Sequence, residues 1–331
     1  MTGKVDTVMA MDSARARTFG AVRLFSSLSV AVVIAFSITF SQLLGPNSLQ
    51  WQVAIALIAL ANGIPHGAID HLITLPRSKP AKMAIFITIY VAIALVAILA
   101  ILQWNVWGFI AVVLMSSIHF GVGDSAYIAE LNSLNSKKRS RISTWAYAAA
   151  AGFIPVVIPL VNSRSTQALE KVNPVLIDWH HGFDGELLIA MAALATLATL
   201  ILAQDRQWRD LLDLFLLIGL VSFAPPLVAF ATYFGCWHAM RHTARLTSLL
   251  PQSLARYSEG NSFAAFRSAV LPGLPALVGT FIFVIVLAAF ARESINDRFL
   301  WLTLVTIWAL TVPHMMVTAR LDRLALKKAD I

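Results

Sequence analysis

The sequence predicts an all-α membrane protein, a polytopic transmembrane helix bundle of about ten spans. Of its 331 residues, 58% are hydrophobic and only 13% are charged, whereas soluble domains carry about 25% charged residues. The mean hydropathy is +0.75. Apolar runs of about 20 residues, the length at which a helix crosses a bilayer, recur from one end of the chain to the other.

The apolar runs divide the chain into spans and short loops. We expect spans at about residues 24–45, 51–74, 82–103, 105–129, 142–161, 185–204, 209–223, 226–247, 271–292 and 299–319. The seventh is short and is separated from the eighth by Ala224-Pro225-Pro226, so the count falls to nine if this pair is re-entrant. A basic segment, residues 1–23, precedes the membrane-embedded region, residues 24–320, and a basic tail, residues 321–331, follows it.

Lysine and arginine gather in alternate loops, after the even-numbered spans and before the first. We therefore interpret the net charge of +8 as a topology signal that faces anionic lipid, and not as a nucleic-acid surface. The positive-inside rule then places both termini in the cytoplasm and the 162–184 loop outside, in a multi-pass protein of the cell (inner) membrane. Arg241 is expected to extend towards the inner surface. The single cysteine, Cys236, excludes an internal disulfide.

Ionisable residues inside the spans point to a functional site, because a buried charge in a membrane is costly. Five of the eight histidines lie at comparable depth in even-numbered spans that run in the same direction: His66, His119, His238, His242 and His314. His238 and His242 are four residues apart, which puts both rings on one helix face, as in helical metal sites. His71 lies nearer the interface, and His180 and His181 lie in the long outer loop.

Imidazole is the commonest protein metal ligand and suits iron, copper, zinc and nickel. Ligating histidines usually donate their second N–H to a carboxylate or carbonyl, a role that Asp70 and Asp124 are expected to fill. Asp70 lies four residues after His66, on the same helix face, and is therefore expected to serve His66. The alternative for each histidine is a hydrogen bond between membrane helices. We interpret His314 as a pocket or packing residue rather than a ligand. Phe120, Tyr233 and Trp237 lie near the histidines in the sequence and are candidate pocket residues.

Three short motifs resemble those of a known family. They are His66-Gly67-Ala68-Ile69-Asp70-His71, His119-Phe120-Gly121-Val122-Gly123-Asp124 and Trp237-His238-Ala239-Met240-Arg241-His242. In this order within a membrane bundle, they resemble the Brp/Blh-type β-carotene 15,15′-dioxygenases over residues 24–320. Residues 1–23 lie outside the resemblance, and we assign them no chemistry.

The resemblance implies an integral membrane, iron(II)-dependent enzyme that uses O2 to cleave β-carotene at its central double bond into two all-trans-retinal molecules. It also implies that a retinal-binding rhodopsin receives the product. The family's proposed iron ligands match His66, His119, His238 and His242. No catalytic residue beyond the metal centre is expected.

Two other functions are compatible with intramembrane histidines. A membrane di-iron hydroxylase or desaturase commonly carries His-x-x-His-His clusters, and this chain has none. A transporter of metal ions or protons would use intramembrane histidine and aspartate as a pathway, with polar residues spread across the membrane depth. Here they concentrate in one layer, and the chain has no internal repeat of the transporter type.

Overall fold

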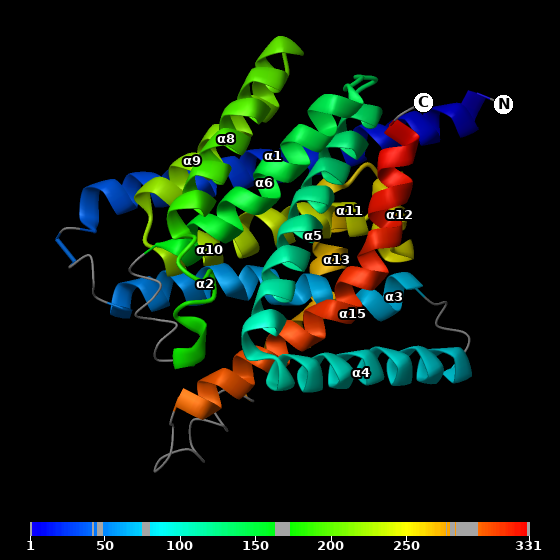
Figure 1. Ribbon diagram of the computed structural model, residues 1–331. Helices are drawn as coiled ribbons and strands as arrows, with labels where there is room; N and C mark the ends of the chain where they lie inside the picture. The colour runs from blue at the N-terminus through cyan, green and yellow to red at the C-terminus, as the bar shows by residue number, and fades with distance from the viewer. Residues whose placement is uncertain are drawn as a thin grey trace.

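The computed structural model describes residues 2–41, 43–44, 49–74, 80–162, 173–275, 277–278, 282 and 297–329. In this part of the chain every regular element is helical, which confirms the predicted all-α class. Figure 1 shows long helices packed side by side and across one another. Helix α5 packs most extensively against α6, α6 also packs against α8, and α15 packs against both α4 and α5.

Within the described residues, eight long helices form the body of the bundle. They are α1 (Thr2–Phe40), α2 (Leu49–Gly67), α4 (Pro80–Gln103), α5 (Asn105–Leu134), α6 (Arg141–Val161), α8 (Asp184–Gln204), α9 (Trp208–Phe223) and α15 (Asp297–Ala329). The shorter elements are α3 (Asp70–Thr74), η1 (Pro174–Leu176), α10 (Pro226–Thr232), η2 (Tyr233–His238), α11 (Ala239–Leu246), α12 (Pro251–Ser258), α13 (Ser262–Val270) and η3 (Leu271–Gly273). The element η2 is a turn of π-helix, and η1 and η3 are 3-10 helices.

Five helices in the described residues are long and apolar enough to cross a membrane. They cover Met9–Phe40, Pro80–Gln103, Asn105–Leu134, Arg141–Val161 and Asp184–Gln204. The count of ten spans therefore stays a prediction. Most of the expected span at residues 271–292 lies outside the described residues, which there include only the 3-10 turn at Leu271–Gly273 and a few positions after it.

The first helix is longer than the expected span. Helix α1 runs without interruption from Thr2 to Phe40, so residues 2–23 are a helical extension of the first span. Its N-terminal part contacts α12 and α13. Arg15 donates to the Ser248 hydroxyl and Arg17 donates to the Gly260 carbonyl oxygen. The basic N-terminal segment thus holds the 248–262 region against the bundle.

Three glycines bring two pairs of helices unusually close. A Cβ on Gly152 of α6 would overlap the carbonyl oxygen of Ser117 on α5, and a Cβ on Gly121 would overlap that of Ala148. A Cβ on Gly235 would likewise overlap the carbonyl oxygen of Ala59 on α2. Small residues allow such close packing of membrane helices. The Gly235 contact brings η2, which carries His238, close to α2, which carries His66, and the other two contacts hold α5, which carries His119, close to α6.

Candidate metal centre

Four elements of the bundle bring the five intramembrane histidines into one cluster. His66 comes from α2, His119 from α5, His238 and His242 from the continuous segment η2–α11, and His314 from α15. Each ring centroid lies 4.8–6.4 Å from at least three of the others. The histidines that the sequence placed at one depth therefore meet, and we call them the histidine cluster.

The histidine cluster is buried and has unused nitrogens. Its five side chains belong to residues that are only 2–8% exposed. Hydrogen-bond partners are lacking for Nε2 of His119, His238 and His314 and for both ring nitrogens of His242. An unsatisfied buried donor or acceptor costs about 1–3 kcal/mol. Several such atoms in one place indicate that the cluster is built to bind something.

A metal ion fits this donor set by its chemistry. Neutral imidazole nitrogens in an apolar surrounding are good ligands for a first-row transition metal. In the described residues, no group of three or more His, Cys, Asp or Glu side chains is arranged so that it could hold a metal ion as it stands. The unpaired nitrogens of the histidine cluster are therefore the observation that makes these side chains candidate metal ligands.

His314 has the carboxylate partner that was expected for His66. Its Nδ1 lies 2.8 Å from Oδ2 of Asp70, and Tyr90 donates to the same oxygen at 3.2 Å. Asp70 begins α3, directly after α2, and α15 brings His314 to it. His66 instead places Nδ1 against the carbonyl oxygen of Gly63. The structure thus pairs Asp70 with His314. It also places His314 inside the cluster, whereas the sequence analysis interpreted His314 as a pocket or packing residue.

Aromatic rings cover part of the cluster. The Phe120 ring lies 4.4 Å from that of His238, and the Phe234 ring lies 5.6 Å from that of His66. The Tyr233 ring contacts Phe120 at 5.6 Å, but its hydroxyl donates to the Ala151 carbonyl oxygen on α6. Phe234 was missed because its position within a turn of π-helix cannot be read from 3.6-residue periodicity.

Asp124 anchors the histidine-bearing segment η2–α11 instead of contacting a histidine. Its Oδ1 accepts from Arg241 at 2.7 Å, and its Oδ2 accepts from Tyr147 at 2.7 Å and from Trp237 at 3.0 Å. The Arg241 guanidinium also lies 3.6 Å from the centre of the Trp237 ring. Trp237 is therefore a partner of Asp124, and its indole N–H is not available to the cluster.

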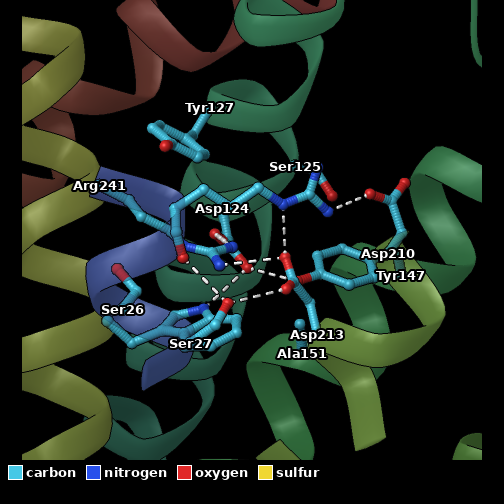
Figure 2. Close-up of polar contacts among 12 residues, drawn as sticks. Ser26, Ser27, Asp124, Ser125, Tyr127, Tyr147, Ala151, Asp210, Asp213 and Arg241 are labelled. Carbon is cyan, nitrogen blue, oxygen red and sulfur yellow. Dashed lines mark hydrogen bonds and ion pairs between the residues drawn. The ribbon is translucent and has the colours of Figure 1, made fainter. Parts of the chain in front are cut away.

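Arg241 does not extend to the membrane surface, as the sequence suggested. It is only 1% exposed and bridges Asp124 on α5 and Asp213 on α9. Figure 2 shows this contact among the residues of α1, α5, α6 and α9. A long basic side chain extends to the surface only where its helix faces lipid, and this one faces the bundle interior. The expectation for Arg241 was therefore wrong.

The ion pairs continue to the first helix. Arg23 donates to Asp213 at 2.8 Å and to Asp210 at 2.5 Å, and Arg139 pairs with Asp210 at 3.1 Å. This buried ion network consists of Arg23, Arg139, Arg241, Asp124, Asp210 and Asp213, and the more exposed Arg209 lies 3.9 Å from Asp213 at its edge. A separate pair of contacts joins Arg245 to Glu130 at 3.0 Å and to Asp322 at 2.5 Å. Arg23, Arg139 and Arg245 lie near the ends of spans, where the positive-inside rule treats them as loop charges, but in the structure they form ion pairs that hold helices together.

Comparison with known proteins identifies the family. The family model described as beta-carotene 15,15′-dioxygenase matches residues 57–322, which include all five clustered histidines and both aspartates of the motifs. The chain belongs to the beta-carotene 15,15′-dioxygenase family. The resemblance seen in the three motifs is thereby confirmed.

Two relatives extend this family assignment. The chain is 26% identical over 287 residues to "Beta-carotene 15,15′-dioxygenase" of an uncultured marine bacterium, 66A03, an alignment covering 83% of this chain and 94% of the relative. It is 26% identical over 313 residues to "Probable beta-carotene 15,15′-dioxygenase Blh" of Halobacterium salinarum, covering 80% and 82%. No solved structure matches the chain.

Proposed function

We propose that this chain is a membrane-bound, iron(II)-dependent dioxygenase that cleaves β-carotene at the central 15,15′ double bond. One polyene and one O2 give two all-trans-retinal molecules, so the atoms balance. The observation that carries the proposal is the cluster of buried histidines with unpaired ring nitrogens, in a chain of the beta-carotene 15,15′-dioxygenase family. The names of both relatives support β-carotene as the substrate.

His66, His119, His238 and His242 would hold the iron. Bound there, Fe(II) would supply the activation of O2 that an organic side chain cannot provide. His314, whose orientation is held by Asp70 at 2.8 Å, has its unpaired Nε2 in the same cluster and is a fifth candidate ligand. Imidazole ligands are neutral, so the ion would keep its full charge in an apolar surrounding.

The protein's own contribution is positioning and the exclusion of water. The polyene carries no charge, so a helix bundle can select its central double bond only by shape and by contact with apolar walls. Phe120 and Phe234 cover the cluster, which keeps water from the donors. Asp124 and the ion network hold η2–α11 against α5, which fixes His238 relative to His119. Correct placement of reacting groups is a large part of enzymatic rate enhancement.

The proposed location is the cell membrane, with both termini cytoplasmic and the lipid bilayer as the surrounding partner. The five long apolar helices support a membrane location. The alternation of basic loops supports the orientation. In Figure 1 both chain ends lie towards the same upper-right side of the view. A retinal-binding rhodopsin is the proposed acceptor of the product.

Expression in β-carotene-producing cells tests the proposal. Cells with the wild-type chain should lose their orange colour and accumulate retinal, measured by chromatography, and the purified protein should contain iron. Alanine variants of His66, His119, His238 and His242 should accumulate in the membrane but make no retinal. A metal or proton transporter would leave β-carotene intact, and that result would reject the proposed reaction.

A further inference from the structure

A large cavity lies between α5 and α15, beside the histidine cluster. Its volume is about 950 Å³. Along α5 it is lined by Met115, Ile118, His119 and Val122, and along α15 by Val312, Met315, Met316 and Ala319. We call this cavity the α5–α15 groove. None of the pocket residues expected from the sequence, Phe120, Tyr233 and Trp237, is among its lining residues, so it is a separate feature of the site.

The floor of the α5–α15 groove reaches the histidine cluster through His119. The His119 ring lies 4.8 Å from that of His238 and 5.4 Å from that of His314. Its Nδ1 is 3.4 Å from the Thr318 hydroxyl of α15, and its Nε2 has no partner. The groove therefore leads from the outside of the bundle to His119, a member of the histidine cluster.

The groove is open on the side that faces hydrocarbon. Ile118 is 55% exposed and Met316 is 60% exposed, one on each wall. Both lie in apolar stretches of their helices, so their exposed surfaces contact lipid chains in a membrane. Methionine side chains adapt their shape to an apolar ligand, and Met115, Met315 and Met316 all line the groove. These walls fit a long hydrocarbon that enters sideways from the bilayer.

The other end of the groove is basic. Its rim includes Lys137, Lys138, Arg323 and Lys327. In the proposed orientation this rim lies at the cytoplasmic surface, where basic residues meet anionic lipid headgroups. From His119 to Ser133 on α5 is 14 residues, about 21 Å at 1.5 Å per residue. The groove thus extends along the cytoplasmic half of the membrane, with the histidine cluster at its inner end.

We propose that the α5–α15 groove is the lateral entrance through which the polyene leaves the cytoplasmic leaflet and reaches the metal centre. This inference rests on the proposed function, which supplies the polyene as the ligand. The groove accommodates one half of the symmetrical substrate, from the cleaved bond outwards, because His119 lies at its inner end. Apolar walls that end at a cluster histidine favour a polyene over a phospholipid, whose headgroup would remain at the basic rim.

Tryptophan substitutions on the two walls test the groove. Ala319→Trp on α15 and Ile118→Trp on α5 place a large side chain at exposed positions, where folding tolerates it. The matched controls are Ala193→Trp and Ile189→Trp on the exposed face of α8, a helix that contributes no residue to the lining of the groove. We expect the wall variants to lower kcat/KM for β-carotene at least tenfold with unchanged iron content, and the controls to stay within twofold of wild type.

Carotenoid retention gives a readout that does not depend on turnover. In a His238→Ala background, protein purified from β-carotene-producing cells should retain carotenoid, and adding Ala319→Trp should remove most of it while Ala193→Trp should not. Wall variants that match their controls in both measurements would overturn the entrance. Loss of co-purified anionic phospholipid with unchanged carotenoid would also overturn it. If the wild type makes no retinal but the wall variants lose carotenoid, the proposed reaction fails and the groove stands.

Discussion

Replacing Asp70 by asparagine is expected to weaken iron retention through His314, and not through His66. The Asp70 carboxylate lies 2.8 Å from Nδ1 of His314 and accepts its N–H, which leaves Nε2 as the lone-pair donor facing the cluster. Asparagine keeps the shape but removes the negative charge. Losing the hydrogen-bonding partner of a ligating histidine typically costs about 10–100-fold in metal affinity, or about 1.4–2.7 kcal/mol.

The assay is iron per protein after dialysis against a graded chelator series, with retinal formation measured on the same samples. We expect Asp70→Asn to release iron at about 10–100-fold lower chelator concentration than wild type. Tyr90→Phe is the matched control, because it removes a 3.2 Å hydrogen bond to the same carboxylate oxygen and leaves the contact with His314 in place. The Tyr90 variant should retain iron nearly as well as wild type.

A double-mutant cycle identifies the residue through which Asp70 acts. If Asp70 acts through His314, adding Asp70→Asn to His314→Ala should change iron affinity by less than about twofold, because contacting residues do not act additively. Two results would refute the reasoning: the same loss in both backgrounds, which would assign Asp70 to another histidine, and no loss in either, which would remove it from the site. His314→Ala with full iron content would exclude His314 as a ligand.

Three other predictions follow from the packing and the topology. Asp124→Ala leaves the buried Arg241 without one of its two carboxylates and should lower the stability in detergent by about 3–5 kcal/mol; a thermal midpoint equal to wild type would contradict the buried ion pair. Gly152→Ala forces α5 and α6 apart and should cost about 1–3 kcal/mol, whereas Gly20→Ala, with no atom within 4 Å of the added Cβ, should cost nothing and stabilise α1 by up to about 1 kcal/mol. A reporter fused after Lys328 should be cytoplasmic, and a periplasmic signal would overturn the orientation.

The histidine cluster could be predicted because membrane depth can be read from the sequence. Each histidine lies at a countable distance from a basic loop, and spans of one direction bring equal distances to one level. The depth of a residue in the membrane does not say in which direction around the helix axis its side chain points. The relation between His66 and Asp70 was inferred from their spacing on a single helix, but α2 ends at Gly67 and α3 begins at Asp70. The break turns the Asp70 carboxylate to His314 instead.

The buried ion network was missed although a signal for it existed. Asp210 and Asp213 stand in an otherwise apolar span, where charged residues are costly and need partners. Arg23 and Arg139 lie at span boundaries, where a basic residue is interpreted as a topology signal whether or not it is buried. Only the packing of α1 and α6 against α9 distinguishes the two cases. The number of acidic residues within spans would have been the better indicator.

The segment from Trp237 to His242 joins the ion network to the histidine cluster. Trp237 and Arg241 are four residues apart and both bond Asp124, while His238 and His242, each one residue later, lie in the cluster. Successive helical residues point about 100° apart, so one face is fixed by Asp124 and the neighbouring face presents two imidazoles. Asp124 itself lies five residues after His119 on α5. The same contacts that neutralise Arg241 therefore set the 4.8 Å distance between the His119 and His238 ring centroids. A substitution in the ion network should accordingly change the affinity of the cluster for a metal ion.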